Sequence, residues 1–76
     1  MSIKTMKQEI LSMSKNYGLD TGHIFPPKMI TSKLIKLNPQ DKEDFINAFD
    51  ELVSEGTFED KDTGLFLTEE GRKVLY

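Results

Sequence analysis

The chain has 76 residues, no cysteine, one histidine and a formal net charge of −3. The lack of cysteine excludes disulfides and thiolate-bound metals, and a single histidine excludes a multi-histidine metal cluster. A chain of this length builds one small core, so we expect a single domain over residues 1–76.

The charge is divided unevenly between the two halves of the chain. Residues 1–36 carry six lysines and two acidic residues, whereas residues 37–76 carry four basic and eleven acidic residues. No apolar run approaches the roughly 20 residues that cross a bilayer, and residues 1–7 lack the apolar segment of a signal peptide. We therefore expect a cytoplasmic protein. The uneven charge indicates that each half favours partners whose charge is opposite to its own.

The first segment predicts a helix over about residues 2–16. Ser2 suits the N-cap and Gly18 suits the position beyond the end. One stripe of the helix is apolar and consists of Ile3, Met6, Ile10, Met13 and Tyr17. We expect this stripe to face the core. The alternative is the seam of a homodimer, although two heptads are short for a coiled coil.

A connector and a second helix follow. Two glycines and a Pro-Pro pair interrupt residues 18–27, where we expect Ile24 and Phe25 to enter the core and a short strand at residues 23–25. Residues 28–37 predict a short helix with Pro27 in its first turn. Its apolar face holds Met29, Ile30, Leu34 and Leu37.

The second half predicts a long helix, a hairpin and a last short helix. The long helix spans about residues 39–55 and begins at the N-cap residue Asn38. Its core-facing stripe is Phe45, Ala48, Phe49, Leu52 and Val53. Residues 57–59 and 65–67 are rich in strand-forming side chains and flank a polar turn that contains a glycine, the pattern of a hairpin.

The last helix is expected over residues 69–75. Thr68 suits its N-cap, and two glutamates follow in the first turn, where carboxylates meet the positive end of the helix dipole. We expect Val74 and Leu75 to fold back on the core.

Two segments of the second half resemble winged-helix domains of prokaryotic transcription regulators. Residues 51–59 read Glu-Leu-Val-Ser-Glu-Gly-Thr-Phe-Glu, and residues 65–72 read Leu-Phe-Leu-Thr-Glu-Glu-Gly-Arg. In that family a helix often ends in such an acidic, Gly-terminated turn, a wing hairpin follows, and a Leu-Thr-Glu-x-Gly-Arg/Lys segment comes next. The resemblance covers about residues 28–76 and implies a mainly α fold with a small β-hairpin.

The resemblance also implies where such a domain makes its contacts. The second and third helices would form a helix-turn-helix, with the third helix reading DNA and the hairpin acting as the wing. The implied positions are the exposed face of the third helix and the wing tip, here Gln40, Asp41, Lys42, Asp44, Asn47, Asp50, Glu51, Lys61 and Thr63.

This chain departs from the family pattern in its charge. The third helix carries six acidic residues against Lys42 alone. DNA affinity draws on Lys and Arg at the phosphates, so acidic side chains disfavour the usual docking. Our leading interpretation is a non-catalytic module, in transcription regulation, whose acidic third helix and wing contact a protein partner. The residues assigned to this contact are Asp41, Asp44, Asp50, Glu51 and Phe66. A solvated face that keeps the protein soluble is the alternative interpretation of these acids.

Phe66 is assigned to the contact because strand side chains alternate. Leu65 and Leu67 should face one side of the wing and Phe66 the other. We expect Phe66 either to be exposed as an anchor for a partner or to pack on Tyr76 or the last helix.

The alternative function is direct DNA binding. The contacts would be the lysines of the second helix and residues of the third helix and wing, namely Lys28, Lys33, Lys36, Gln40, Lys42, Asn47 and Lys61. Lys4, Lys7 and Lys15 would join them if the first two helices lie side by side.

Nothing in the sequence marks a catalytic or metal site. Residues 60–64 begin like a calcium loop, but the twelfth position from Asp60 is Gly71 and not an acid, so a hairpin turn is the preferred interpretation. His23 lies in a Gly/Pro-rich connector with no nucleophile or carboxylate pair placed beside it. We therefore predict no enzyme activity and no cofactor.

Overall fold

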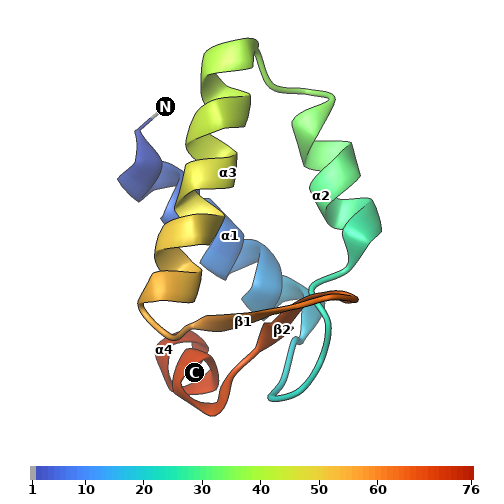
Figure 1. Ribbon diagram of the computed structural model, residues 1–76, viewed down its shortest axis with the longest axis vertical. Coiled ribbons are helices and arrows are strands. Elements are labelled where there is room, and N and C mark those ends of the chain that lie inside the picture. Colours follow the sequence, from blue (N-terminus) through green and yellow to red (C-terminus); the bar gives the residue numbers. More distant parts are fainter. Residues whose placement is uncertain (1) are drawn as a thin grey trace.

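The computed structural model describes residues 2–76, which form four helices and a two-stranded antiparallel hairpin (Figure 1). The elements are α1 (Ile3–Tyr17), α2 (Pro27–Leu34), α3 (Pro39–Ser54), β1 (Phe58–Lys61), β2 (Gly64–Leu67) and α4 (Glu69–Leu75). The predicted mainly α class with one small hairpin is confirmed.

Local capping chemistry explains where α1 begins and ends. The Ser2 hydroxyl accepts the Thr5 N–H at 3.1 Å, and Gly18 ends the helix with a left-handed φ of 82°. The predicted stripe faces the core through Met6 and Ile10, which are both fully buried. Its last member does not, because Tyr17 is 61% exposed.

The connector after α1 runs along the outer edge of β2. The Phe25 N–H donates to the Leu65 carbonyl at 2.7 Å, and the Leu67 N–H donates to the His23 carbonyl at 3.0 Å. The expected strand at residues 23–25 is reduced to an isolated bridge between Ile24 and Phe66. Phe25 itself is buried, as predicted.

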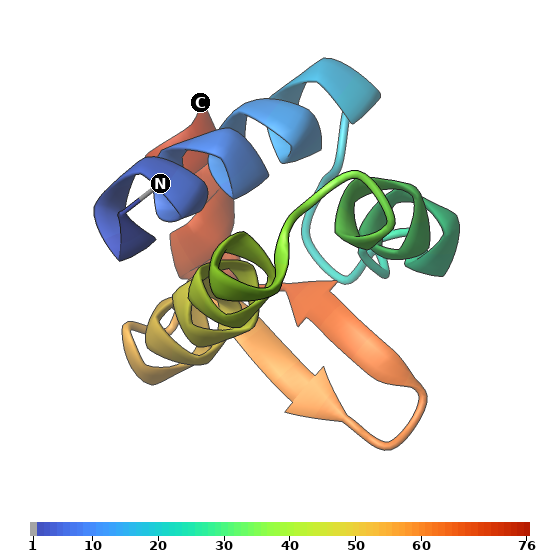
Figure 2. The ribbon, with the colours of Figure 1, turned by 90° about the horizontal axis from the view of Figure 1, so that it is seen from above.

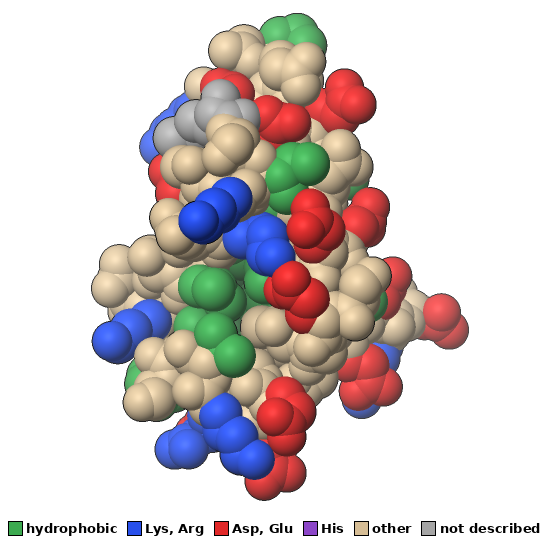
Figure 3. All heavy atoms as spheres, turned by 90° about the vertical axis from the view of Figure 1, so that its left-hand side faces the viewer, with side chains coloured by type: hydrophobic (Ala, Val, Ile, Leu, Met, Phe, Trp, Pro, Cys, Tyr) green, Lys and Arg blue, Asp and Glu red, His purple; other side chains and the backbone are tan. Residues whose placement is uncertain are grey.

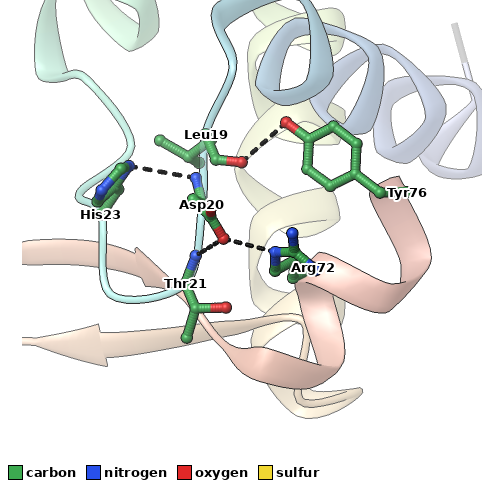
Figure 4. Close-up of polar contacts among 6 residues, drawn as sticks. All are labelled: Leu19, Asp20, Thr21, His23, Arg72 and Tyr76. Atoms are coloured by element: carbon green, nitrogen blue, oxygen red, sulfur yellow. Dashed lines mark hydrogen bonds and ion pairs between the residues drawn. The ribbon is translucent and has the colours of Figure 1, made fainter.

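A second set of contacts ties this connector to α4 (Figure 4). The Asp20 carboxylate accepts the Thr21 N–H and the Arg72 Nε–H, each at 2.7 Å. These hydrogen bonds lower the pKa of Asp20, the backbone one contributing most. The Tyr76 hydroxyl donates to the Leu19 carbonyl at 2.9 Å, so the C-terminal end of α4 is held against the end of α1.

Helix α2 is shorter than predicted and lies at the periphery of the core. It ends at Leu34 instead of Leu37, and the Lys36 and Leu37 N–H groups then bond three residues back, each at 3.2 Å. Of residues 27–34, all of which the structure describes, none is fully buried. Its apolar side chains are half-buried and pack against the rim of the core.

Helix α3 supplies the centre of the core. Asn38 caps it by accepting the Asp41 N–H at 2.8 Å, and the predicted stripe is buried at Phe45, Ala48, Phe49 and Leu52. Edge-to-face ring contacts join the connector, α3 and β1, with ring centroids 5.1–6.0 Å apart, among Phe25, Phe45, Phe49 and Phe58.

The hairpin has longer arms and a tighter turn than predicted. Phe58 pairs with Leu67 and Lys61 with Gly64, which leaves only residues 62–63 in the turn. Helix α4 follows with Thr68 as its N-cap, as predicted, and the Thr68 hydroxyl accepts the Gly71 N–H at 2.9 Å.

The end of α4 matches the sequence prediction only in part. Leu75 packs into the core, but Val74 is 60% exposed, so only one of the two residues folds back as expected.

The helices surround the core on three sides (Figure 2). Helix α1 packs on one side of α3, α2 runs beside α3 in the opposite direction, and the hairpin projects away from α1 (Figures 1 and 2). None of the helices in residues 2–76 is long and apolar enough to cross a membrane.

Candidate functional site

The acidic residues assigned to protein contact do not form one surface. Glu51 and Glu55 both pair with Lys7 of α1, at 3.7 and 2.6 Å. The hydrogen bond from Lys7 to Glu55 is the main cause of the raised pKa of this lysine. Acidic side chains gather along one side of the face in Figure 3, over α3 and the hairpin. Part of that acidic face is therefore already neutralised by α1.

Two more of the predicted contact residues, Asp41 and Asp44, lie at the start of α3. Asp44 is half-buried and accepts a hydrogen bond from Gln40 at 3.2 Å. Asp41 is half-buried in the first turn, where its carboxylate meets the positive end of the helix dipole. The Asp44 carboxylate thus has a partner within the chain, and Asp41 also takes part in an interaction.

Asp50 instead lies on an apolar groove between α2, α3 and the hairpin, which we call the acidic groove. Its volume is about 490 Å³. Ile30 and Leu34 of α2 line it, together with Asp60 and Leu65 of the hairpin. Helix α3 contributes the other six lining residues, which are Phe45, Ile46, Phe49, Asp50, Val53 and Ser54. Spacings of four and three along α3 place Ile46, Asp50 and Val53 on one side of the helix, next to its buried stripe.

The charge of the acidic groove has one sign. Asp50 of α3 and Asp60 of β1 carry the carboxylates, and among the described lining residues none is a cation. Neither carboxylate has a hydrogen-bond or ion-pair partner within residues 2–76. The groove thus combines an apolar interior with two unpaired negative charges from different elements.

Phe66 lies outside this groove and is half-buried instead of exposed. The Lys61 ammonium lies 5.0 Å from the centroid of its ring, and Ile24 bridges to it from the connector. This arrangement differs from both predicted alternatives, which were an exposed anchor and packing on Tyr76 or α4. Sequence alternation placed the side chain on the correct strand face but gave no sign of the connector or of the lysine above it.

The two lysines of α2 and Lys36, which follows that helix, do come together. Lys28, Lys33 and Lys36 line a second hollow of about 390 Å³ with Met13, Met29 and Ser32, which we call the lysine hollow. Lys33 also reaches Glu9 of α1 at 3.2 Å, which neutralises part of this charge. Lys7 points toward α3 and does not extend the patch, contrary to the expectation of one positive face across the first two helices.

The residues proposed to read bases are spread over the molecule. Gln40 and Asn47 are seven positions apart and share one side of α3, whereas Lys42 is two positions from Gln40 and points to another side. Lys61 belongs to the hairpin, at the opposite end of α3 from its first turn (Figure 1). These four side chains do not form one reading surface.

His23 has a structural partner. Its Nδ1 accepts the Asp20 N–H at 3.2 Å (Figure 4). Within residues 2–76 no group of three His, Asp or Glu side chains is placed to hold a metal ion.

Sequence reasoning assigned no role to several side chains that line the acidic groove. The sequence did contain one indication, because Ile46 is a large apolar residue outside the predicted core stripe of α3. In the structure its side chain is 53% exposed. Ile30, Leu34 and Leu65 gave no such signal, since each fits an ordinary core pattern.

Comparisons with protein-family models, curated proteins and solved structures find no match to this chain. The function is therefore inferred from the geometry and charge of its own surfaces.

Proposed function

We propose that this chain is a winged-helix binding module that contacts a basic protein partner through α3 and the hairpin. The observation that carries the proposal is the meeting of Asp50 and Asp60, from two different elements, at one apolar groove whose lining holds no cation among residues 2–76. Exposed carboxylates beside apolar surface attract a positively charged partner and discourage an acidic one.

The order of the elements supports the winged-helix assignment. Three helices precede the hairpin, a short helix follows it, and the connector bridges β2 at Ile24. The Leu-Thr-Glu-Glu-Gly-Arg segment, which carries the family resemblance, lies where β2 passes into α4. By this assignment the hairpin is the wing and α3 occupies the place of the recognition helix.

The charge of the groove favours protein over nucleic acid as its partner. A phosphate backbone brought to Asp50 and Asp60 would be repelled, and the penalty would grow as water leaves the interface. Lysine and arginine side chains of a protein would instead form charge-assisted hydrogen bonds with both carboxylates.

A peptide selection tests the proposal. Random peptides of about 16 residues, long enough for four helical turns, are displayed on phage and selected on the immobilised protein. We expect enrichment of peptides with net positive charge. The best of them should lose affinity when Asp50 and Asp60 are both changed to lysine.

The matched control changes Glu43 and Asp62 to lysine. These residues lie on the same two elements, are exposed and do not line the groove, while the change in net charge is the same. If both double variants weaken binding equally, the partner senses only net charge and the groove site is wrong. Enrichment of neutral or acidic peptides would contradict the proposal itself.

Direct DNA binding is the second candidate, because Lys28, Lys33 and Lys36 line one hollow. Three phosphate contacts predict binding that weakens about 40-fold between about 50 and about 200 mM salt. Titration of mixed-sequence duplex DNA measures this. Changing all three lysines to glutamate should abolish the binding, whereas Lys73→Glu, at a lysine of α4 outside the proposed DNA contacts, should change it only slightly. An absence of binding at low salt would exclude this candidate.

A further inference from the structure

We infer that the acidic groove takes an amphipathic helix of the partner, with apolar side chains pointing into the groove and Lys or Arg on its flanks. This inference rests on the proposed function and adds the form of the partner segment. It is carried by the exposed apolar walls of the groove, its extent along α3 and the placement of its two carboxylates.

The apolar walls of the groove stay accessible because α2 lies at the periphery of the core. The floor is made by Phe45 and Phe49, which are buried, and Leu65 closes the hairpin end. Ile30 and Leu34 of α2 stay half-buried on one wall, and Ile46 of α3 stays exposed on the other. Both walls thus keep apolar surface in water, and an inserted apolar side chain would remove that surface from water.

The length of the groove fits a short helical segment. Along α3 the lining residues run from Phe45 to Ser54, which corresponds to about 13.5 Å at 1.5 Å per residue. Side chains at positions i, i+3 or i+4, and i+7 of a helix share one face and span about 10.5 Å along its axis. Three anchors at this spacing fit between α2 and α3. A helix laid there would pack against two helices, the way an amphipathic helix enters a groove.

The carboxylates specify the flanks of the helix. Asp50 lies on the α3 side of the groove and Asp60 on the hairpin side. A bound helix would therefore carry its Lys or Arg residues beside its apolar face and not within that face. Within the part of the chain that the structure describes, neither acid has a partner that it would lose on binding. An acidic or purely apolar helix would leave both carboxylates unpaired at the closed interface, which is unfavourable.

Two isoleucine variants test the inference with the most enriched peptide from the selection as the probe. Ile46→Gln removes an apolar wall of the groove without adding charge. Ile35→Gln is the matched control, because Ile35 is 74% exposed and does not line the groove. We expect Ile46→Gln to weaken peptide binding about tenfold or more, the loss typical of a central contact, and Ile35→Gln to have no effect.

Two measurements on the wild-type protein make the test independent of how well the variants fold. The peptide should gain helical circular dichroism on binding. The methyl resonances of Ile30, Leu34, Ile46 and Leu65 should shift, while those of Ile3 and Val74, outside the groove, should not.

The outcomes separate this inference from the proposed function. If the aspartate variants weaken binding but Ile46→Gln matches Ile35→Gln, the partner is held by charge alone and the inference fails while the function stands. A bound peptide that stays extended also overturns the helix. If neither pair of variants differs from its control, both proposals fail together.

Discussion

Replacing Gly71 with alanine is expected to destabilise the protein, against the usual effect of such a change in a helix. A Cβ on Gly71 would clash with the Thr57 carbonyl oxygen and would lie 2.7 Å from a methyl carbon of Leu67. The Leu67 side chain can rotate away. The Thr57 carbonyl is held in place, because it accepts the Thr68 N–H at 3.2 Å.

The magnitude follows from two opposing contributions. In a helix interior, alanine is favoured over glycine by about 1 kcal/mol. Here α4 must move by roughly 1 Å, an overpacking that costs about 1–3 kcal/mol, and the movement loosens the Thr68 cap at about 1 kcal/mol more. The net loss is about 2 kcal/mol, out of about 4–11 kcal/mol for a domain of this size.

Thermal unfolding followed by circular dichroism measures the effect. A loss of about 2 kcal/mol lowers Tm by roughly 8–16 °C in a domain of this length. Glu70→Ala, on the exposed side of the same helix, is the control; it loses a first-turn carboxylate and an exposed ion pair with Lys73, and should cost less than about 1 kcal/mol. A Tm for Gly71→Ala equal to or above that of the unmodified protein would refute the close packing of α4 on Thr57.

Four further predictions follow from the packing and the charges. Phe25→Ala removes the ring that contacts Phe49 and Phe58, and should cost about 3–5 kcal/mol by urea unfolding; a smaller loss would contradict the aromatic core. Thr68→Ala should cost about 1–2 kcal/mol in the same assay, with most of it recovered by serine. Because the pKa of Asp20 is lowered below its ordinary value of 3.8, Asp20→Asn should reduce Tm at neutral pH, and this difference should vanish as the pH falls through the folded-state pKa; a constant difference would exclude the charge as its cause. Amide protons of α2 should exchange faster than those of α1 and α3 in native-state hydrogen exchange, and equal protection would contradict its peripheral packing.

Elements set by local chemistry were predictable from the sequence. Ser2, Asn38 and Thr68 each cap a helix through a side-chain oxygen that accepts a backbone N–H three residues ahead, and that geometry needs no distant partner. The core stripes of α1 and α3 were predictable for a similar reason, because the spacing of apolar residues fixes which side of a helix is buried.

The errors lie where the extent of a neighbouring element decides burial. Periodicity assigns Tyr17 and Val74 to helix faces, but it does not say how far the neighbouring elements extend over those faces. Both side chains remain mostly exposed. The early end of α2 did have a local signal. Asn38 must be extended to cap α3, with ψ at 168°, so residues 35–37 reverse the chain instead of continuing the helix.

The segment that carries the winged-helix resemblance has a structural explanation. Its threonine caps α4, and its glycine, Gly71, lets α4 approach the Thr57 carbonyl. Both features hold the last helix against the segment around the hairpin, where Gly71 is buried and Thr68 is half-buried. The resemblance therefore informs the expected fold, while the function depends on the side chains that the fold exposes.

The acidic groove could not be predicted because three elements build it, and because α2 stands away from α3 by a distance that no local pattern encodes. The same placement separates the two proposed functions. Met29 lines the lysine hollow and its neighbour Ile30 lines the acidic groove, so α2 presents one side to each. Charge reversal of Lys28, Lys33 and Lys36 leaves the groove lining intact, and Ile46→Gln leaves the lysine hollow intact. A protein that binds both a basic helix and DNA would lose each activity with one set of variants only, whereas a single shared surface would lose both with either set.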